Sequence, residues 1–149
     1  MEILVIPDSF KGSLSAIEVA QVMAKTVKNV FPSSNCLSIP FSDGGEGALN
    51  VLASNIKGTF MECSTYDALK RPIKAPYFSF KNQKSVWIEL SQTAGITQLK
   101  SSELQPLKTS TWGTGKMIKD AINIGCKTIY LGIGAVSYTH LTLPTKRIV

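Results

Sequence analysis

The feature that most constrains this sequence is a run of four apolar residues close to its start, at positions 3–6. Apolar residues without alternation are typical of a strand buried on both faces of a parallel sheet. Pro7 ends this strand because proline has no N–H to donate. Ser15 and Glu18 match a capping box, which predicts that a helix begins after a short loop. The stretch therefore predicts an α/β fold, in which loops at the carboxyl ends of strands bind ligands.

The loop between this strand and the helix places Asp8, Ser9 and Lys11 within four positions. The N–H groups at the start of the helix point back toward the loop, and such helix termini favour anions. The loop is therefore predicted to form an anion site.

Further elements follow from the periodicity of the apolar residues. Steps of three and four over residues 17–31 predict a helix that packs on the sheet. A short strand is predicted at residues 35–40, and a right-handed crossover would place its end beside the end of the first strand. A second helix with apolar positions between 49 and 56 and a third strand of this first domain at residues 59–65 complete the pattern.

The second loop, at residues 43–47, reads Asp-Gly-Gly-Glu-Gly. Its glycines permit positive φ and close approach of the backbone to a ligand, while Asp43 and Glu46 offer hard oxygen ligands. The same carboxylates would serve equally well in the acidic first turn of a helix. The residues alone leave both interpretations open.

The second half of the sequence changes in character. Residues 73–80 and 85–90 are two strand-like runs that predict an antiparallel hairpin. Residues 106–115 combine hydroxyls and glycines ahead of a predicted helix, which is typical of a phosphate cradle. This segment is not a Walker A loop, because that motif requires glycine in place of Ser110 and serine or threonine in place of Met117. The alternative is a glycine-rich start of a helix capped by Thr114.

Composition indicates a globular chain, with 44% hydrophobic and 17% charged residues. The net charge of +6 is spread over scattered lysines, which favours a solvated basic surface and no nucleic-acid partner. Cys36, Cys63 and Cys126 match no zinc or redox spacing, so free thiols are expected. The apolar start is too short for a signal peptide or membrane span, from which a cytoplasmic location and no membrane partner are expected.

Four segments carry a resemblance to a known family. Residues 7–16, Pro-Asp-Ser-Phe-Lys-Gly-Ser-Leu-Ser-Ala, resemble the N-terminal signature of the glycerate kinases, which are ATP-dependent enzymes that phosphorylate D-glycerate. The Asp-Gly-Gly-Glu-Gly loop is similar to the second signature of that family. Residues 89–96 match a third segment more loosely, and the segment at 106–115 is similar to the Thr-Ser-x-Gly-x-Gly loop of the family.

The resemblance implies two α/β domains with glycerate and phosphates bound between them. Residues 1–70 would form a Rossmann-like parallel sheet with flanking helices, and residues 71–135 would begin a second, mixed α/β domain. Residues 136–149 would be an atypical tail, because they lack the glycines and the aspartate of a Gly-rich loop that continues the family pattern. The single histidine, His140, lies in this tail and is given no catalytic role.

The resemblance and the chemistry of the side chains together imply roles for individual residues. Lys11 would contact phosphate or carboxylate, and Asp8 would orient or deprotonate the glycerate hydroxyl. ATP and Mg²⁺ are the implied cofactors, with Asp43 and Glu46 as metal ligands. Glu89 would touch ligand or cap a short helix. The substrate candidates are Ser9, Asp43, Gly44, Gly45, Glu46 and Glu89, and the phosphate candidates are Ser110, Gly113, Thr114 and Gly115.

The resemblance reaches from Met1 to about Ala135, which is less than half of a family member. We therefore expect a truncated glycerate kinase that is inactive as written and prone to aggregate. The alternative is a non-catalytic α/β module that binds anions or a partner.

Overall fold

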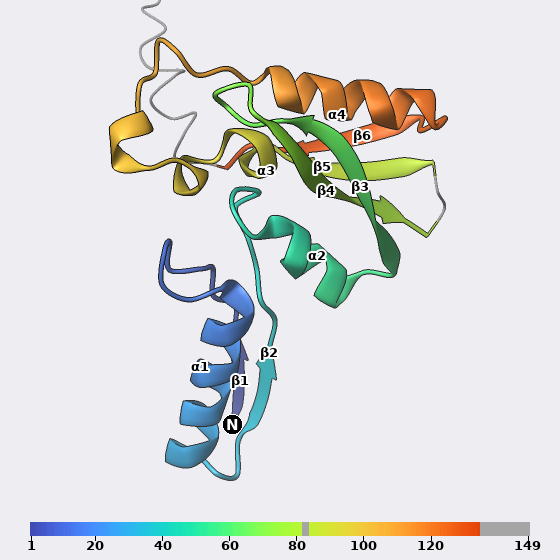
Figure 1. The fold of residues 1–149 in the computed structure, drawn as a ribbon. Coiled ribbons are helices and arrows are strands. Elements are labelled where there is room, and N and C mark those ends of the chain that lie inside the picture. Colours follow the sequence, from blue (N-terminus) through green and yellow to red (C-terminus); the bar gives the residue numbers. More distant parts are fainter. Residues whose placement is uncertain (82–83, 135–149) are drawn as a thin grey trace, which may run out of the picture.

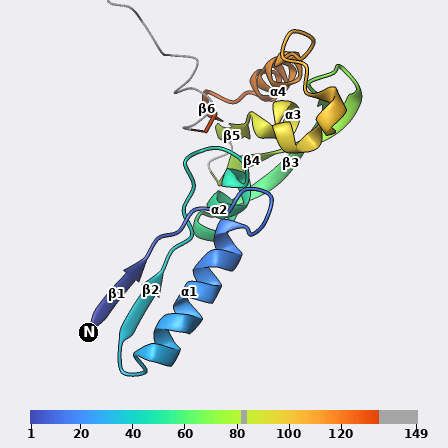
Figure 2. The ribbon, with the colours of Figure 1, turned by 90° about the vertical axis from the view of Figure 1, so that its left-hand side faces the viewer.

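The computed structural model describes residues 1–81 and 84–134, which form two sheets. A two-stranded parallel sheet with one helix forms the first part of the chain, and a four-stranded sheet forms the second part (Figure 1). A view at right angles shows the two parts end to end, with loops of the first part reaching toward the second (Figure 2). The α/β class expected from the sequence is confirmed.

The first part is a single strand, helix, strand unit. Strands β1 (Glu2–Val5) and β2 (Asn35–Ser38) pair in parallel, with Leu4 opposite Leu37. Helix α1 (Ala16–Val30) connects them and packs on one face of the pair. The carboxyl ends of both strands lie side by side, as the sequence predicted, and Figure 1 shows that they point toward the second part.

Helix α1 begins with the predicted capping box. The Ser15 hydroxyl accepts the backbone N–H of Glu18 at 3.3 Å, and the Glu18 carboxylate accepts the backbone N–H of Ser15 at 2.8 Å. Hydrogen bonds donated by the side chain and the backbone of Ser15 lower the pKa of Glu18. The cap fixes where the loop ends and the helix starts, and so fixes the length of the loop that carries Lys11.

The second sheet mixes two kinds of pairing. Its strand order is β3-β4-β5-β6, with antiparallel pairing from β3 to β5 and parallel pairing between β5 and β6. The hairpin predicted for residues 73–80 and 85–90 is confirmed as β4 and β5. The strands are β3 (Gly58–Tyr66), β4 (Pro72–Phe80), β5 (Ser85–Glu89) and β6 (Thr128–Gly132).

Three helices belong to this second part. Helix α2 (Ala48–Asn55) follows the loop at residues 43–47, which we refer to as the acidic loop. The short helix α3 (Ser91–Ala94) follows β5, and α4 (Trp112–Asn123) precedes β6. Two 3-10 turns, Ile96–Gln98 and Ser101–Glu103, lie between α3 and α4. None of the helices within the described ranges is long and apolar enough to cross a bilayer.

The main core lies between the second sheet and α4, which covers one of its faces (Figure 1). Its members are apolar side chains that alternate along the strands or lie on the inner face of the helix, together with Cys126 between α4 and β6. They are Cys63, Ala75, Tyr77, Val86, Ile88, Met117, Ala121 and Cys126.

Helix α2 covers the opposite face of the same sheet (Figure 1). Phe78, which follows Tyr77 on β4 and therefore points to the other side, is 1% exposed, and Leu49 of α2 is 2% exposed. The second sheet is thus a central layer between two helices, although α2 follows the first sheet in sequence.

One strand lies elsewhere than the sequence suggested. We expected the strand near residues 59–65 to be the third strand of the first domain. It forms as β3, but it pairs with β4 along its whole length, from Gly58 opposite Phe80 to Tyr66 opposite Pro72. The expectation of a third strand in the first sheet is therefore wrong, while the domain boundary near residue 70 stays a prediction.

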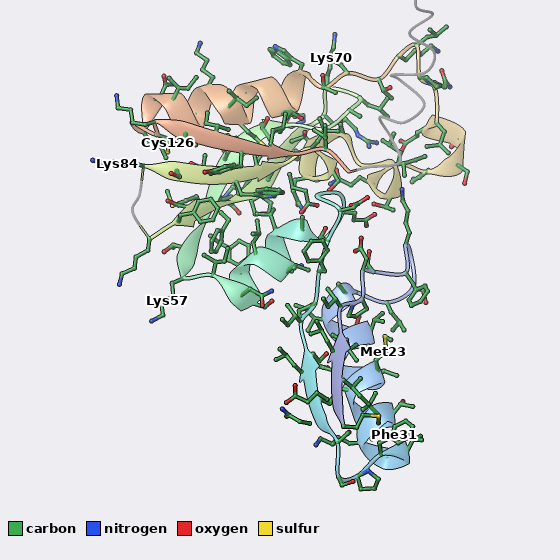
Figure 3. All side chains as sticks on the ribbon, turned by 180° about the vertical axis from the view of Figure 1, so that it is seen from behind. Met23, Phe31, Lys57, Lys70, Lys84 and Cys126 are labelled. Carbon is green, nitrogen blue, oxygen red and sulfur yellow. The ribbon has the colours of Figure 1, made fainter. Side chains whose placement is uncertain are left out.

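The first sheet leaves apolar side chains in solvent. Leu4 and Leu37 are each 58% exposed, on the face that α1 does not cover. Met23 of helix α1 and Phe31, which follows the helix, are also exposed apolar side chains (Figure 3). The core of the chain is therefore concentrated in its second part.

Candidate active site

The loops that follow β1 and β2 lie side by side. The N–H of Phe41 donates to the carbonyl oxygen of Pro7 at 2.9 Å, so the two segments stay paired beyond the strands. Asp8 links the loops, because Oδ1 accepts the N–H of Ser9 at 2.6 Å and Oδ2 accepts the N–H of Asp43 at 3.1 Å. The predicted approach of the two strand ends is confirmed, and a carboxylate lies at their junction.

A cavity of about 480 Å³ opens between these loops and the second part of the chain. Its far wall comes from the segment around α3 and from the residues that follow β6. We refer to it as the acceptor cavity. It brings together six of the predicted site residues, which are Asp8, Ser9, Lys11, Asp43, Gly45 and Glu46.

Close backbone packing holds the acidic loop against the second sheet. A Cβ on Gly45 would lie 3.3 Å from the Cα of Gly134, and a Cβ on Gly132 would lie 2.5 Å from the carbonyl oxygen of Gly44. The glycines predicted close approach of the backbone to a ligand, which stays a prediction, whereas the backbone that Gly44 approaches in the structure is the end of β6. Gly45 lines the acceptor cavity, and Gly44 is not among its lining residues.

The charges around the acceptor cavity are mixed. Asp8, Asp43 and Glu46 contribute carboxylates, and Lys11 contributes an ammonium group on an exposed loop. An organic anion bound here would pair with Lys11, while a hydroxyl of the same ligand would find carboxylate acceptors. The residues therefore suit a small hydroxy acid better than a simple anion.

The carboxylates also suit a metal that arrives with a phosphate. Among the described residues, no group of three or more His, Cys, Asp or Glu side chains could hold a metal ion by itself. Mg²⁺ in phosphoryl-transfer sites needs only one or two carboxylates besides the substrate phosphates. The Glu46 carboxylate accepts the hydroxyl of Thr97 at 3.0 Å, and Asp43 Oδ1 accepts the N–H of Gly45 at 2.7 Å, so both groups are oriented.

Of the two roles expected for Glu89, the structure shows the capping of a short helix, and that helix is α2. Its carboxylate is fully buried and accepts the backbone N–H groups of Gly47 at 3.1 Å and Leu49 at 2.9 Å. The Ser91 hydroxyl and the Gln92 amide also donate to it. Glu89 therefore satisfies the start of α2, some forty residues earlier in the chain, and holds the acidic loop from the second sheet.

Sequence reasoning missed three residues near the site. A cavity of about 340 Å³ continues around the first loop, and Asn50 and Gln92 help to line it. Thr97 contacts Glu46 from the segment after α3. Gln92 lay inside a segment already singled out, but Asn50 and Thr97 gave no local signal, because only the tertiary arrangement brings them near the first two loops.

The predicted phosphate segment is divided by the fold. Ser110 lines a cavity of about 630 Å³ beside α3, whereas Gly115 lines a different cavity of about 410 Å³ along α4. Gly113 is buried, and a Cβ there would lie 1.9 Å from the carbonyl oxygen of Tyr66. The four candidates therefore do not converge on one phosphate cradle.

The Thr114 side chain is buried within the fold. Its hydroxyl lies 2.6 Å from that of Thr93, and both side chains are buried. The residue that precedes α4 is Thr111, so the alternative in which Thr114 caps the helix is wrong. The pair of hydroxyls joins α4 to α3, which forms the wall of the acceptor cavity.

Comparison with known proteins agrees with the signatures that form these loops. The sequence model described as the glycerate kinase family matches residues 3–140. The chain belongs to the glycerate kinase family. The match extends to residue 140, beyond the limit near Ala135 that we expected. Residues 135–149, including His140, lie outside the described residues.

Several curated relatives of this family member are named as kinases. A glycerate kinase of Haemophilus influenzae is 34% identical over 134 residues, which are 90% of this chain and 35% of that protein. A glycerate 2-kinase of Escherichia coli is 33% identical over 134 residues, with the same coverage. This glycerate kinase family chain spans about a third of the length of these relatives.

A solved structure supports the fold. The crystal structure of a Salmonella typhimurium LT2 protein described as glycerate kinase 2 superposes with a TM-score of 0.68 and 33% sequence identity. The match covers 91% of this chain and 37% of that protein.

Proposed function

We propose that this chain supplies the acceptor site of a glycerate kinase, an enzyme that transfers the γ-phosphoryl group of ATP to glycerate. The main support is the meeting of Asp8, Lys11 and the acidic loop in one cavity at the ends of two parallel strands. The names of the curated relatives agree with this assignment. The names of these relatives favour an enzyme over the non-catalytic module.

The mechanism assigns complementary roles to the two residues of the first loop. Lys11 pairs with the carboxylate of glycerate or with the transferred phosphoryl group. Two backbone N–H groups orient the Asp8 carboxylate, which is then positioned to accept the proton of the glycerate hydroxyl. The hydroxyl oxygen bonds to the γ-phosphorus, the bond from that phosphorus to the bridging oxygen breaks, and ADP leaves with that oxygen.

The acidic loop completes the proposal. Asp43 and Glu46 would hold Mg²⁺, which neutralises charge on the phosphate oxygens when it is bound with the nucleotide. Ser9 and Gly45 would contact the bound glycerate. Because the reaction consumes ATP, we place the enzyme in the cytoplasm as part of the same proposal.

A lysine substitution tests this function. In a full-length relative such as that of Haemophilus influenzae, Lys11→Ala at the aligned position should lower kcat/KM about 100-fold or more, as expected when a group that stabilises transferred charge is lost. The midpoint of thermal unfolding should not change, because the Lys11 side chain is exposed. A Lys25→Ala change on the exposed side of α1 is the matched control and should leave turnover unchanged. Near-normal turnover of the Lys11 variant would remove this residue from the site.

A further inference from the structure

A second cavity adjoins the acceptor cavity. It measures about 630 Å³ and shares Leu90, Ala94 and Ile96 with the wall of the acceptor cavity. One short segment therefore forms part of the wall of both cavities. We refer to it as the α3 cavity. The remaining residues that line it are Ala68, Leu99, Leu104, Gln105, Pro106, Thr109, Ser110 and Thr111.

The lining of the α3 cavity suits a flat organic ring. None of the described residues that line it carries a charge, and its walls include Leu90, Leu99 and Leu104. One rim carries three consecutive hydroxyls, at residues 109–111. Small-molecule sites combine apolar walls of this kind with a few polar groups that fix orientation. A sugar with an attached base would bury the base against the leucines and present its own hydroxyls to the polar rim.

A competing cavity lies along α4 and β3. It measures about 410 Å³ and contains Lys116 and Lys119, which would favour phosphate. Its aromatic wall is formed by Trp112 and Tyr66, whose ring centroids lie 4.9 Å apart, with the Lys116 Nζ 4.7 Å from the centre of the Tyr66 ring. We refer to it as the α4 cavity. By its chemistry alone, it is also a candidate for a nucleotide.

Position decides between the two cavities. Phosphoryl transfer requires the donor phosphorus to lie within a few ångströms of the acceptor oxygen. The α4 cavity shares no lining residue with the acceptor cavity, whereas the α3 cavity shares three. A nucleotide in the α4 cavity would therefore hold its phosphates away from Asp8 and Lys11.

We infer that the α3 cavity holds the base and ribose of the nucleoside triphosphate, with the phosphates directed past Ala94 toward Lys11. This inference rests on the proposed function for the identity of the nucleotide. It separates the two substrates by residues: the acceptor is held by the first two loops, and the nucleoside is held by the segment from α3 to the start of α4. Of the predicted phosphate candidates, only Ser110 lies in this cavity.

Substitutions at the wall of each cavity test the inference. Leu104→Trp fills the α3 cavity from a side chain that is 44% exposed, so folding should tolerate it. Leu107→Trp is the matched control, because Leu107 lies three residues away, is fully exposed and lines neither cavity. Lys116→Ala tests the α4 cavity. Each substitution is made in the 149-residue chain and at the aligned position of the Escherichia coli relative.

The readouts separate the nucleotide from the acceptor. In the relative, Leu104→Trp should raise the KM for ATP about tenfold while changing the KM for glycerate less than about twofold, because only one binding region is obstructed. In the 149-residue chain, the same change should weaken binding of a fluorescent N-methylanthraniloyl-ADP by a similar factor. Leu107→Trp and Lys116→Ala should match the unaltered protein in both measurements.

Other results overturn the inference without touching the proposed function. If Lys116→Ala weakens nucleotide binding and Leu104→Trp does not, the nucleoside lies in the α4 cavity. If no variant of the relative changes the KM for ATP, neither assignment holds, even when the unaltered enzyme phosphorylates glycerate normally. If the 149-residue chain binds no N-methylanthraniloyl-ADP, the inference fails for this chain. If the relative prefers another acceptor, the proposed function fails while the ATP measurements still test the cavity.

Discussion

The backbone N–H of Leu49 donates to Glu89 Oε2 at 2.9 Å, although the two residues are forty positions apart. The neighbouring N–H of Gly47 donates to Oε1 of the same carboxylate at 3.1 Å. A fully buried carboxylate from the end of β5 thus holds the start of α2 and the end of the acidic loop. The position of Asp43 and Glu46 in the acceptor cavity depends on this contact.

Replacing this carboxylate should weaken both the fold and the site. We expect Glu89→Gln to lower the free energy of unfolding by about 1.5–3 kcal/mol, because buried hydrogen bonds to a charged group are lost. Urea unfolding of the chain at low protein concentration measures this change. In a full-length relative, the KM for glycerate should rise more than the KM for ATP. Glu62→Gln, which breaks an exposed pair with Lys74, should change stability by less than about 1 kcal/mol. Equal effects of the two variants would contradict a positioning role for Glu89.

Two glycines of α4 should respond in opposite directions to the same substitution. Gly113→Ala would place a Cβ 1.9 Å from the carbonyl oxygen of Tyr66, so we expect a loss of stability of about 1–3 kcal/mol from overpacking. Gly115→Ala meets no atom within 4 Å and should stabilise the helix by about 0.5–1 kcal/mol. Thermal unfolding of both variants provides the comparison. A loss of kinase activity in a stable Gly115→Ala relative would instead support a phosphate contact at that position.

Asp67 should make the chain sensitive to acid. Burial alone would raise its pKa, but hydrogen bonds from the backbone and side chain of Arg71 and from the N–H of Leu69 outweigh burial and hold the pKa below its usual value. A carboxylate with a lowered pKa stabilises the fold above its unfolded-state value of about 3.9 and loses this contribution as the pH falls through the folded-state pKa. Asp67→Asn should therefore cost about 1–3 kcal/mol at pH 7 and progressively less below about pH 4.

Unfolding curves measured from pH 7 to pH 2 test this dependence. The difference between the unaltered chain and Asp67→Asn should shrink in acid, whereas Glu2→Gln on an exposed strand end should show little difference at any pH. A constant difference between the Asp67 variant and the unaltered chain would show that the Asp67 charge does not contribute.

The exposed apolar face of the first sheet should cause self-association. Leu4 and Leu37 are register partners on β1 and β2 and are each 58% exposed. Contiguous exposed apolar surface and open strand edges favour association. We expect the apparent mass of the purified chain to rise with its concentration, as measured by light scattering. Leu37→Lys should reduce this increase, while Leu107→Lys, at an isolated exposed leucine, should not. A monomer at all concentrations would contradict the prediction.

Local sequence patterns predicted the loops of the site well. The capping box at Ser15 and Glu18 fixed the start of α1, and two β-strand ends followed by polar loops predicted the meeting of Asp8 with the acidic loop. These features depend on contacts between residues close in sequence or on the general geometry of parallel strands. Such contacts are visible in a single sequence.

The features that the sequence did not reveal depend on distant pairing. A strand-like run does not identify its partner strand, so the sequence predicts the strand at residues 59–65 in the first sheet, whereas it pairs with β4 in the second. Glu89 lies at a strand end, and nothing in the sequence around it indicates that its carboxylate accepts hydrogen bonds from the start of a helix forty residues earlier. Glycines and hydroxyls predicted a phosphate loop at residues 106–115, but close packing requires Gly113, and Thr114 pairs with another hydroxyl.

The path of the chain gives the acidic loop a mechanical role. Within the described residues, the backbone passes once from the first sheet to the second, and it does so through the segment after β2 that carries Asp43. The Asp8 carboxylate accepts a hydrogen bond from the N–H of Asp43 in this segment, and the Glu89 carboxylate accepts one from the N–H of Gly47 at its end. The segment is thus a linker held by hydrogen bonds at both ends. A rotation of one sheet against the other would change the position of Asp43 relative to Asp8. A ligand that contacts both Asp8 and the far wall of the acceptor cavity would restrict the motion of this linker and fix the angle between the first and second parts of the chain.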